Sequence, residues 1–440
     1  PRVRPPPAVP AGGRTEHGVH VTRLAGADLV VYRKTGVPLV TLGIYVPRLR
    51  FDPPGQAGLG SLLMRAAVRG AGDFDAAALA FAFERLGGTL ATSSVSDWLG
   101  FGASVLVEHL GEAATLLDTV FLHPHLRDAD IAAERGLMTA EAERVADDMF
   151  RYPFQLAFSA AFGERGYGAP VGGLPESLPG IAPEHVRAWH RAALLEARPL
   201  VVAVGDVEPE RASDELAGIF AARPPIPLVP FSETVPWVAG SAGDSPARVV
   251  SRDKAQVALA MAFPGPSRRH RDHAVAQVWS AVASGLGGRL FEALRDRRSL
   301  AYTVLASAWQ KARGGALVTY IATSPEREDE AREQMLVELE RFAEEPVTEA
   351  ELRGAVNYLA GQAEVSRQNA ASVAGEILEC WIAAGSLEEM ADPGAPFRAV
   401  TAQDVQRLAA GSLEPAKRAE GVVRGTGASR PPAPVAASRG

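Results

Sequence analysis

Two stretches of the sequence, about half the chain apart, repeat one arrangement of secondary structure. Residues 181–205 contain a cap region, an amphipathic helix and a β-branched final strand, and residues 400–425 place the same parts in the same order. Chance similarity between alanine-rich helices is the alternative explanation. The repeat predicts a duplicated α+β unit of roughly 200 residues, with a sheet and its covering helices in each copy.

The chain of 440 residues exceeds what one hydrophobic core supports, so we expect two domains. We place them at residues 17–222 and 247–425, joined by a proline- and glycine-rich linker at 223–246. The Pro/Ala/Gly-rich ends, 1–16 and 426–440, are predicted to be a disordered leader and tail.

Composition narrows the class of protein. The 47% hydrophobic and 22% charged residues are typical of a soluble globular protein, and the net charge of −7 gives no reason to expect nucleic acid. No apolar run reaches the ~18 residues of a membrane span. The lone Cys380 excludes an intramolecular disulfide. The start at Pro1 and the proline-rich leader favour a bacterial envelope compartment after removal of a signal peptide.

Short β-branched runs alternate with amphipathic stretches, which predicts a largely antiparallel sheet with helices packed on it in each half. We expect strands at residues 19–25, 28–34, 38–46, 89–96, 98–105, 199–205, 248–254, 256–263, 301–311 and 315–323. We expect helices at residues 56–69, 75–88, 107–119, 127–147, 152–163, 183–194, 270–283, 289–295, 326–344, 348–364 and 370–384.

The first predicted helix, within PGQAGLGSLLMRAAVRG at 54–70, carries nothing that could bind a metal. Leu59, Leu62, Leu63 and Ala66 recur at three- and four-residue steps and form one apolar face. Taken alone, the stretch is an ordinary amphipathic helix.

The second half contains the most specific string, SGLGGRLFEALRDRRSLAYTV at 284–304. It resembles the C-terminal-domain signature of the M16 (insulinase/pitrilysin) zinc peptidases, whose relatives include the mitochondrial processing peptidase and the core subunits of respiratory complex III. LGGTLATSSVSD at 86–97, FLHPHLRDADIAAERGLMTAEAE at 121–143 and YGAPVGGLPESLPGIAPEHVRAWHRA at 167–192 follow the family's order and spacing. The resemblance covers about residues 17–425.

The resemblance implies that the metal motif is degenerate here. Active members carry H-x-x-E-H on the first helix, where two His hold Zn²⁺ and the Glu is the general base. Those positions are here Gly58, Ser61 and Leu62. The family's third ligand corresponds to Glu141, seven residues after Glu134. One carboxylate cannot make a zinc site, so we expect no metal on this chain and assign the glutamate pair to surface solvation or a salt bridge.

The nine histidines offer no clear replacement site. His270 and His273 have a spacing that two ligands could use, but no third ligand flanks them in a recognisable pattern. His123 and His125 lie in a predicted loop, and His109 lacks a second His nearby.

Other parts of the family's machinery have counterparts in this chain. The resemblance assigns Arg295 and Tyr302 to a pair that binds the substrate backbone and helps to stabilise the oxyanion, and both side chains are donors suited to that role. The structural alternative is that Arg295 only solvates a helix end and that Tyr302 only begins a strand. The resemblance also implies substrate contacts from a glycine-rich loop and from an edge strand that pairs with extended peptides. These residues are Gly285, Gly287 and Gly288 in the loop, and Gly88, Thr89 and Leu90 at the strand.

Two functions follow as hypotheses. The chain is a non-catalytic subunit of a heterodimeric M16-type peptidase, whose homologous partner supplies H-x-x-E-H and zinc and whose substrate is a peptide or unfolded polypeptide. Alternatively, it is a proteolytically inactive structural or peptide-binding protein of the same fold, like the complex III core subunits. A peptidase that works alone with unfamiliar residues is a third possibility, which a stoichiometric metal would support.

Overall fold

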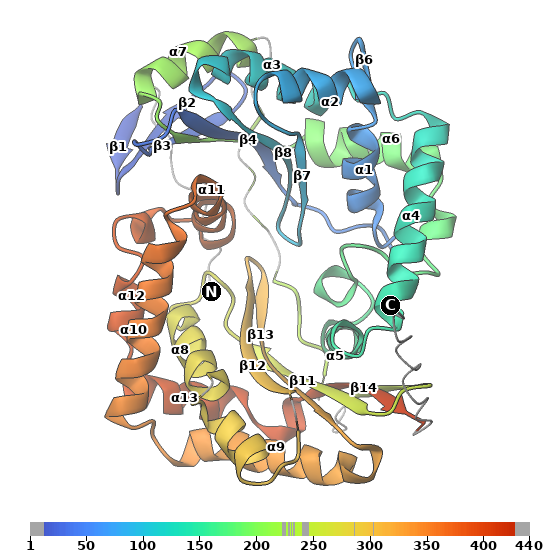
Figure 1. Cartoon of the computed structure of the whole chain (residues 1–440), viewed down its shortest axis with the longest axis vertical. Helices are drawn as coiled ribbons and strands as arrows, with labels where there is room; N and C mark the ends of the chain where they lie inside the picture. Colours follow the sequence, from blue (N-terminus) through green and yellow to red (C-terminus); the bar gives the residue numbers. More distant parts are fainter. Residues whose placement is uncertain are drawn as a thin grey trace, which may run out of the picture.

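The computed structural model describes residues 13–221, 226–227, 229, 231, 234–239, 246–285, 287–301 and 303–426. The chain forms two halves, each built on one mixed sheet with helices packed against it (Figure 1). This architecture confirms the predicted α+β fold. Within the described part of the chain, no helix is both long enough and apolar enough to cross a bilayer.

The N-terminal sheet has seven strands in the order β1-β2-β3-β9-β4-β8-β7. Neighbouring strands in this sheet are antiparallel, except that β3 and β9 are parallel. Apolar side chains alternate with small or polar ones along β4 and β8, so the two faces of the sheet carry different kinds of side chain. The strands are β1 (Arg14–Glu16), β2 (Val19–Arg23), β3 (Asp28–Arg33), β4 (Leu39–Pro47), β7 (Ala91–Ser94), β8 (Trp98–Leu106) and β9 (Leu200–Gly205).

The C-terminal sheet repeats this topology. Its order is β10-β14-β11-β13-β12, with β10 and β14 parallel and the other neighbours antiparallel. Strands β3, β9, β4, β8 and β7 therefore correspond one to one with β10, β14, β11, β13 and β12. The shared order confirms the predicted duplication. The strands are β10 (Ala247–Arg252), β11 (Val257–Gly265), β12 (Thr303–Lys311), β13 (Gly314–Thr323) and β14 (Ala419–Gly425).

Helices cover the outer face of each sheet. In the N-terminal half, α3 packs on β4 and β8, and α7 packs on β3. In the C-terminal half, α8 packs on β12, α9 on β13 and α13 on β11. A two-stranded hairpin, β5 (Gly70–Ala71) with β6 (Phe74–Asp75), follows α1. The helices are α1 (Leu59–Ala67), α2 (Ala76–Arg85), α3 (Leu110–Leu122), α4 (Asp128–Ala146), α5 (Arg151–Phe162), α6 (Pro183–Trp189), α7 (Pro209–Phe220), α8 (His273–Ser284), α9 (Glu328–Glu344), α10 (Glu349–Ser366), α11 (Ala370–Leu378), α12 (Ala395–Arg398) and α13 (Ala402–Ser412).

The two halves exchange one helix each. Helix α5 of the N-terminal half packs on β14 and β11 of the C-terminal sheet, and α11 of the C-terminal half packs on β9 and β4 of the N-terminal sheet (Figure 1). Separate apolar clusters form at each exchange, around Phe162 and Tyr167 in one case and Ile377 and Trp381 in the other. Each sheet therefore depends on the other half of the chain to cover its inner face.

Polar contacts also join the halves at the turn between β12 and β13. The backbone N–H of Ala312 donates to Asp97 at 2.8 Å, and the hydroxyl of Tyr167 donates to the same carboxylate at 2.7 Å. Arg313 donates its backbone N–H to the Tyr167 oxygen at 3.0 Å and its guanidinium to the Arg48 carbonyl at 3.0 Å. Burial is the main reason that the pKa of Tyr167 is raised. These buried contacts tie the C-terminal hairpin to the N-terminal half.

Two sequence expectations differ from the structure. Residues 14–16 form β1 and pair with β2, so the predicted disordered leader is too long at its inner end; residues 1–12 lie outside the described residues. Helix α7 was not predicted, although Pro209 begins it in the usual N-terminal position. The predicted linker is described only in part, and Val235 in it donates its N–H to the Arg313 carbonyl. Of the predicted tail, only residue 426 is described.

Candidate functional site

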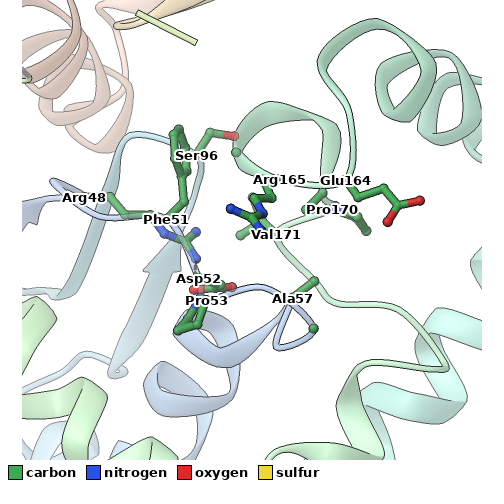
Figure 2. Close-up of a pocket in the computed structure, with 13 residues that line it drawn as sticks. Arg48, Phe51, Asp52, Pro53, Ala57, Ser96, Glu164, Arg165, Pro170 and Val171 are labelled. Carbon is green, nitrogen blue, oxygen red and sulfur yellow. Dashed lines mark hydrogen bonds and ion pairs between the residues drawn. The ribbon is translucent and has the colours of Figure 1, made fainter. Parts of the chain in front are cut away.

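A buried carboxylate fixes the start of α1, the helix that carries Ser61 and Leu62. Asp52 accepts hydrogen bonds from the backbone N–H groups of Gly58 at 2.9 Å and Gly60 at 3.1 Å, and it pairs with the Arg48 guanidinium. Figure 2 shows Arg48 and Asp52 side by side at a cavity of about 30 Å³, room for about one water molecule. A carboxylate suits this end because the first N–H groups of a helix lack partners.

Gly58, Ser61 and Leu62, which the resemblance aligns with the metal motif, offer no zinc ligand. Gly58 has a φ of 96°, and a Cβ there would lie 2.7 Å from the Cα of Gly173. The Ser61 hydroxyl donates to the Val171 carbonyl at 2.7 Å and lies 2.9 Å from the Ser94 hydroxyl. Leu62 is apolar and fully buried. The helix therefore presents neither the nitrogen ligands nor the general base that a catalytic zinc site needs.

The two glutamates of α4 are neutralised by Arg65 of α1 and by Arg69, which lies just beyond the end of that helix. Arg65 donates to Glu134 at 2.8 Å and bidentately to Glu141 at 2.7 and 3.1 Å, and Arg69 pairs with the other oxygen of Glu134. The hydrogen bonds from Arg65 are the main reason that the pKa of Glu141 is lowered. Glu134 is only 2% exposed, whereas Glu141 is exposed. The residues therefore do not fit a metal ion, and the glutamates form a salt-bridge cluster.

The histidines do not converge on another site. His273 Nε2 lies 3.0 Å from Glu389, while His270 Nδ1 accepts the backbone N–H of Asp272 at 3.1 Å. His125 Nε2 lies 2.7 Å from the Gly72 carbonyl. Among the residues that the structure describes, no group of three His, Cys, Asp or Glu side chains could hold a metal.

A cleft of about 390 Å³ remains beside α1. Ser61, Met64 and Arg65 line it from α1, and Thr92 and Ser94 line it from β7. Met138, Glu141 and Gly172 complete the lining. The space beside α1 is therefore open, and the residues that line it include no set of metal ligands.

The predicted substrate strand lies at the edge of the N-terminal sheet. The strand itself, β7, is shorter than predicted, and the predicted residues Gly88, Thr89 and Leu90 lie just before it. As the described residues form the sheet, β7 pairs only with β8. Gly88 and Thr89 line a second cleft, of about 740 Å³, on the inner side of the sheet. These positions are compatible with the predicted role, and Leu90 packs against the core.

The glycine-rich loop of the C-terminal half lines the largest of these grooves. Gly285, Gly287 and Gly288 border a space of about 820 Å³ between α8, β12 and α10. Because β12 corresponds to β7, and α8 and α10 correspond to α1 and α4 in chain order, this groove is the counterpart of the cleft beside α1. Each half therefore places a groove beside its edge strand.

The predicted Arg/Tyr pair is only half described. Arg295 lies on the π-helical turn Phe291–Asp296, half-buried, with its guanidinium 4.4 Å from the centroid of the Phe291 ring. It is a described residue but is not among those that line the glycine groove. Tyr302 lies outside the described residues, so the geometry of the pair stays a prediction.

Sequence reasoning missed the partners of the α4 glutamates. Glu134 and Glu141 are seven residues apart on α4 and share one helix face, while Arg65 lies on α1 and Arg69, four residues later, lies in the turn that follows it. This complementary spacing was the available signal. It also missed Asp97, whose role becomes evident only when the two halves are in contact.

Two family models match most of the chain. Residues 29–173 match the model described as insulinase (peptidase family M16), and residues 180–359 match the model described as the peptidase M16 inactive domain. The first match ends before α6 and the second begins just before it. Together the two matches include both motif regions.

Relatives and solved structures agree with these matches. An uncharacterized zinc protease of Mycobacterium tuberculosis is 29% identical over 289 residues, which cover 64% of this chain and 65% of that protein, just under two thirds of its length. An uncharacterized zinc protease of Streptomyces coelicolor is 24% identical over 411 residues, covering 90% of this chain and 88% of that protein.

Among solved structures, the peptidase M16 inactive domain from Pseudomonas fluorescens has a TM-score of 0.82 at 19% identity, covering 94% of this chain and 99% of that chain. A chain of complex III2 from Candida albicans has a TM-score of 0.76 at 13% identity, covering 92% of this chain and 95% of that one. At these identities the likeness establishes the fold.

Proposed function

Because this chain belongs to the M16 peptidase family, we propose that it is the non-catalytic subunit of a heterodimeric M16-type peptidase. A homologous partner carrying H-x-x-E-H would hold the zinc ion. This chain would bind peptide or unfolded polypeptide and present Arg295 and Tyr302 to it. The whole enzyme's activity and its substrate are parts of this proposal.

One observation carries the proposal: the cleft beside α1 is retained without a metal-binding set. Its one carboxylate, Glu141, is held by Arg65, and the Ser61 hydroxyl contacts the Ser94 hydroxyl and the Val171 carbonyl. Loss of the fold would have closed the cleft, whereas retention of catalysis would have kept the ligands. A subunit that contributes a binding surface but no metal would keep the cleft open and lack the ligands.

The C-terminal half supports the same division of labour. Its glycine groove is open beside the edge strand β12, which suits an extended polypeptide. Arg295 lies on the segment that follows this loop, and a guanidinium and a phenol can both donate to a developing oxyanion. These groups would act on a substrate held mainly by the partner's active site.

The test is hydrolysis of a quenched fluorescent peptide by a mixture of this chain and a homologous H-x-x-E-H subunit from the same cell. We expect activity to need both chains and to fall on the order of 10²-fold with Arg295→Ala or Tyr302→Phe. Arg297→Ala, an exposed arginine on the same segment, is the matched control and should leave the rate unchanged.

Equal cleavage by the partner alone would refute the proposal. The chain would then be a proteolytically inactive structural or peptide-binding protein of the M16 fold. A stoichiometric metal on this chain would refute both alternatives, because the described residues offer no set of ligands for one.

A further inference from the structure

The small cavity at the start of α1 has more hydrogen-bond donors than free acceptors. Its volume is about 30 Å³, and it lies between the segment that joins β4 to α1, the β7–β8 turn and the loop that follows α5. Donor groups come from Arg48, Arg165 and Ser96, and carboxylates come from Asp52 and Glu164. What the cavity can hold depends on which of these groups are already engaged.

The guanidinium of Arg48 is buried but not fully satisfied. Arg48 is only 4% exposed, donates to the Val95 carbonyl at 3.2 Å and pairs with Asp52. Its Nε–H is also buried and has no acceptor among the residues that the structure describes. Because a buried N–H without an acceptor is costly, this donor favours an acceptor inside the cavity.

Neither carboxylate at the cavity is that acceptor. The two oxygens of Asp52 already accept the backbone N–H groups of Gly58 at 2.9 Å and Gly60 at 3.1 Å. The exposed Glu164 carboxylate lies 3.4 Å from the Arg248 guanidinium and points away from the cavity in Figure 2. An acceptor for the Arg48 Nε–H would therefore be a molecule or ion bound in the cavity.

Arg165 adds a positive charge that nothing at the cavity neutralises. Its exposed side chain lines the cavity, and Figure 2 shows it pointing toward Arg48. Within the part of the chain that the structure describes, no acidic side chain pairs with it. Because Arg48 and Asp52 neutralise each other, one positive charge is left over, and the Ser96 hydroxyl is a further donor. A single monovalent anion would balance this charge and accept from these donors.

The size of the cavity restricts which anion can enter. A space of about 30 Å³ holds about one water molecule, and chloride is only slightly larger, whereas phosphate and sulfate are too large. The wall is closely packed at Gly166, where φ is 60° and a Cβ would lie 3.2 Å from the Phe51 ring. A halide ion therefore fits the cavity best.

We propose that this cavity, called here the Arg48 cavity, binds one chloride-sized monovalent anion between Arg48 and Arg165. The anion accepts the Arg48 Nε–H and joins the segment before α1 to the loop after α5. That loop also carries Tyr167, whose hydroxyl donates to Asp97 at the contact between the two halves. Anion binding therefore stabilises the folded chain. The inference concerns neither zinc nor substrate nor partner, so it is independent of the proposed function.

Bromide is the probe for occupancy, because it replaces chloride and scatters X-rays anomalously. Crystals of the full chain soaked in sodium bromide should give an anomalous peak in the Arg48 cavity, between the two guanidinium groups. Crystals of Arg165→Gln should lack this peak. Arg127→Gln, which changes another exposed arginine of the N-terminal half, is the matched control and should keep it. Because both arginines are exposed, neither change should unfold the chain.

Thermal unfolding of the full chain tests binding in solution. Chloride replaces gluconate, which is too large for the cavity, at constant ionic strength, so that general charge screening does not change. Since an anion that binds only the folded chain stabilises it by mass action, we expect chloride to raise the unfolding midpoint by at least about 2 °C. Arg165→Gln should lose more than half of this rise, and Arg127→Gln should retain it.

The proposal is overturned if the wild-type chain shows no bromide peak in the cavity, because the cavity then holds water. It is also overturned if the peak appears but chloride does not raise the midpoint, which would mean binding at crystal concentration only. Equal chloride dependence of Arg165→Gln and Arg127→Gln would likewise overturn it, because the stabilising anion would then bind elsewhere.

Discussion

Replacing Arg65 with Met should destabilise the protein by about 2–3 kcal/mol. The guanidinium of Arg65 holds Glu134, which is 2% exposed, and Glu141, which is exposed. Loss of the exposed pair costs ~0–1 kcal/mol, whereas leaving a buried carboxylate with one partner fewer costs about 1–3 kcal/mol. Arg69 continues to pair with Glu134, which keeps the cost below that of an isolated buried charge.

Thermal unfolding of three variants separates these contributions. Glu141→Gln removes only the exposed pair and should lower the unfolding midpoint slightly, while Arg65→Met should lower it by several degrees. Adding Glu134→Gln to Arg65→Met removes the buried charge and should recover part of the loss. If Glu141→Gln were as costly as Arg65→Met, or if Glu134→Gln gave no recovery, the buried pair would not be the source of the effect.

The pH dependence of the same variants has a defined sign. The pKa of Glu141 is lowered by Arg65, so this carboxylate stabilises the fold above its unfolded pKa of about 4.3 and loses that contribution as pH falls through the lower folded pKa. The difference between wild type and Arg65→Met should therefore be largest near neutral pH and shrink in acid. A difference that grows in acid would contradict this account.

Three further outcomes are expected. The triple change Gly58→His, Ser61→Glu and Leu62→His should not create a stoichiometric zinc site by metal analysis, because a side chain at residue 58 meets Gly173 at a φ of 96°. Asp97→Ala should lower the unfolding midpoint more than Glu143→Ala, an exposed control, because it strands the Tyr167 hydroxyl and the Ala312 N–H, at a cost of about 2–4 kcal/mol. Burial opposes ionisation of Glu389, but His273 and Arg268 together lower its pKa to about 2; stability should therefore decline between about pH 4 and 2, and Glu389→Gln should flatten that decline in urea titrations.

Local pattern predicted most of the elements because their apolar periodicity is strong. Apolar residues alternate along β4 and β8 and recur at helical steps along α1 and α8, while β11 and β13 are nearly continuous apolar runs that are buried on both faces. Errors came where local signals are weak. Three residues pair as β1 because β2 offers a free edge, and the backbone of Val235 is held by Arg313 across the domain boundary. Strand β2 directly follows β1, so β1 was missed because three residues are too few to show a pattern, whereas Val235 and Arg313 are far apart in the sequence.

The candidate site, like the fold, was predictable from the sequence only in part. The absence of ligands at Gly58, Ser61 and Leu62 is visible in the sequence, and the structure adds that these positions are packed or hydrogen-bonded. The cleft of about 740 Å³ beside β7 was not predictable from the sequence, because β4 and β8 line it from the N-terminal half and α11 lines it from the C-terminal half.

The exchange of helices α5 and α11 between the halves explains why the cleft beside β7 stays open. Each half covers its own sheet on the outer face but leaves the inner face to a helix from the other half, α5 on one sheet and α11 on the other. A half separated from its partner would expose an apolar inner face, so each half stabilises the other. Because α11 only partly covers its sheet, β7 and the space beside it stay open. The same arrangement that holds the halves together therefore leaves the edge strand β7 and the cleft beside it open.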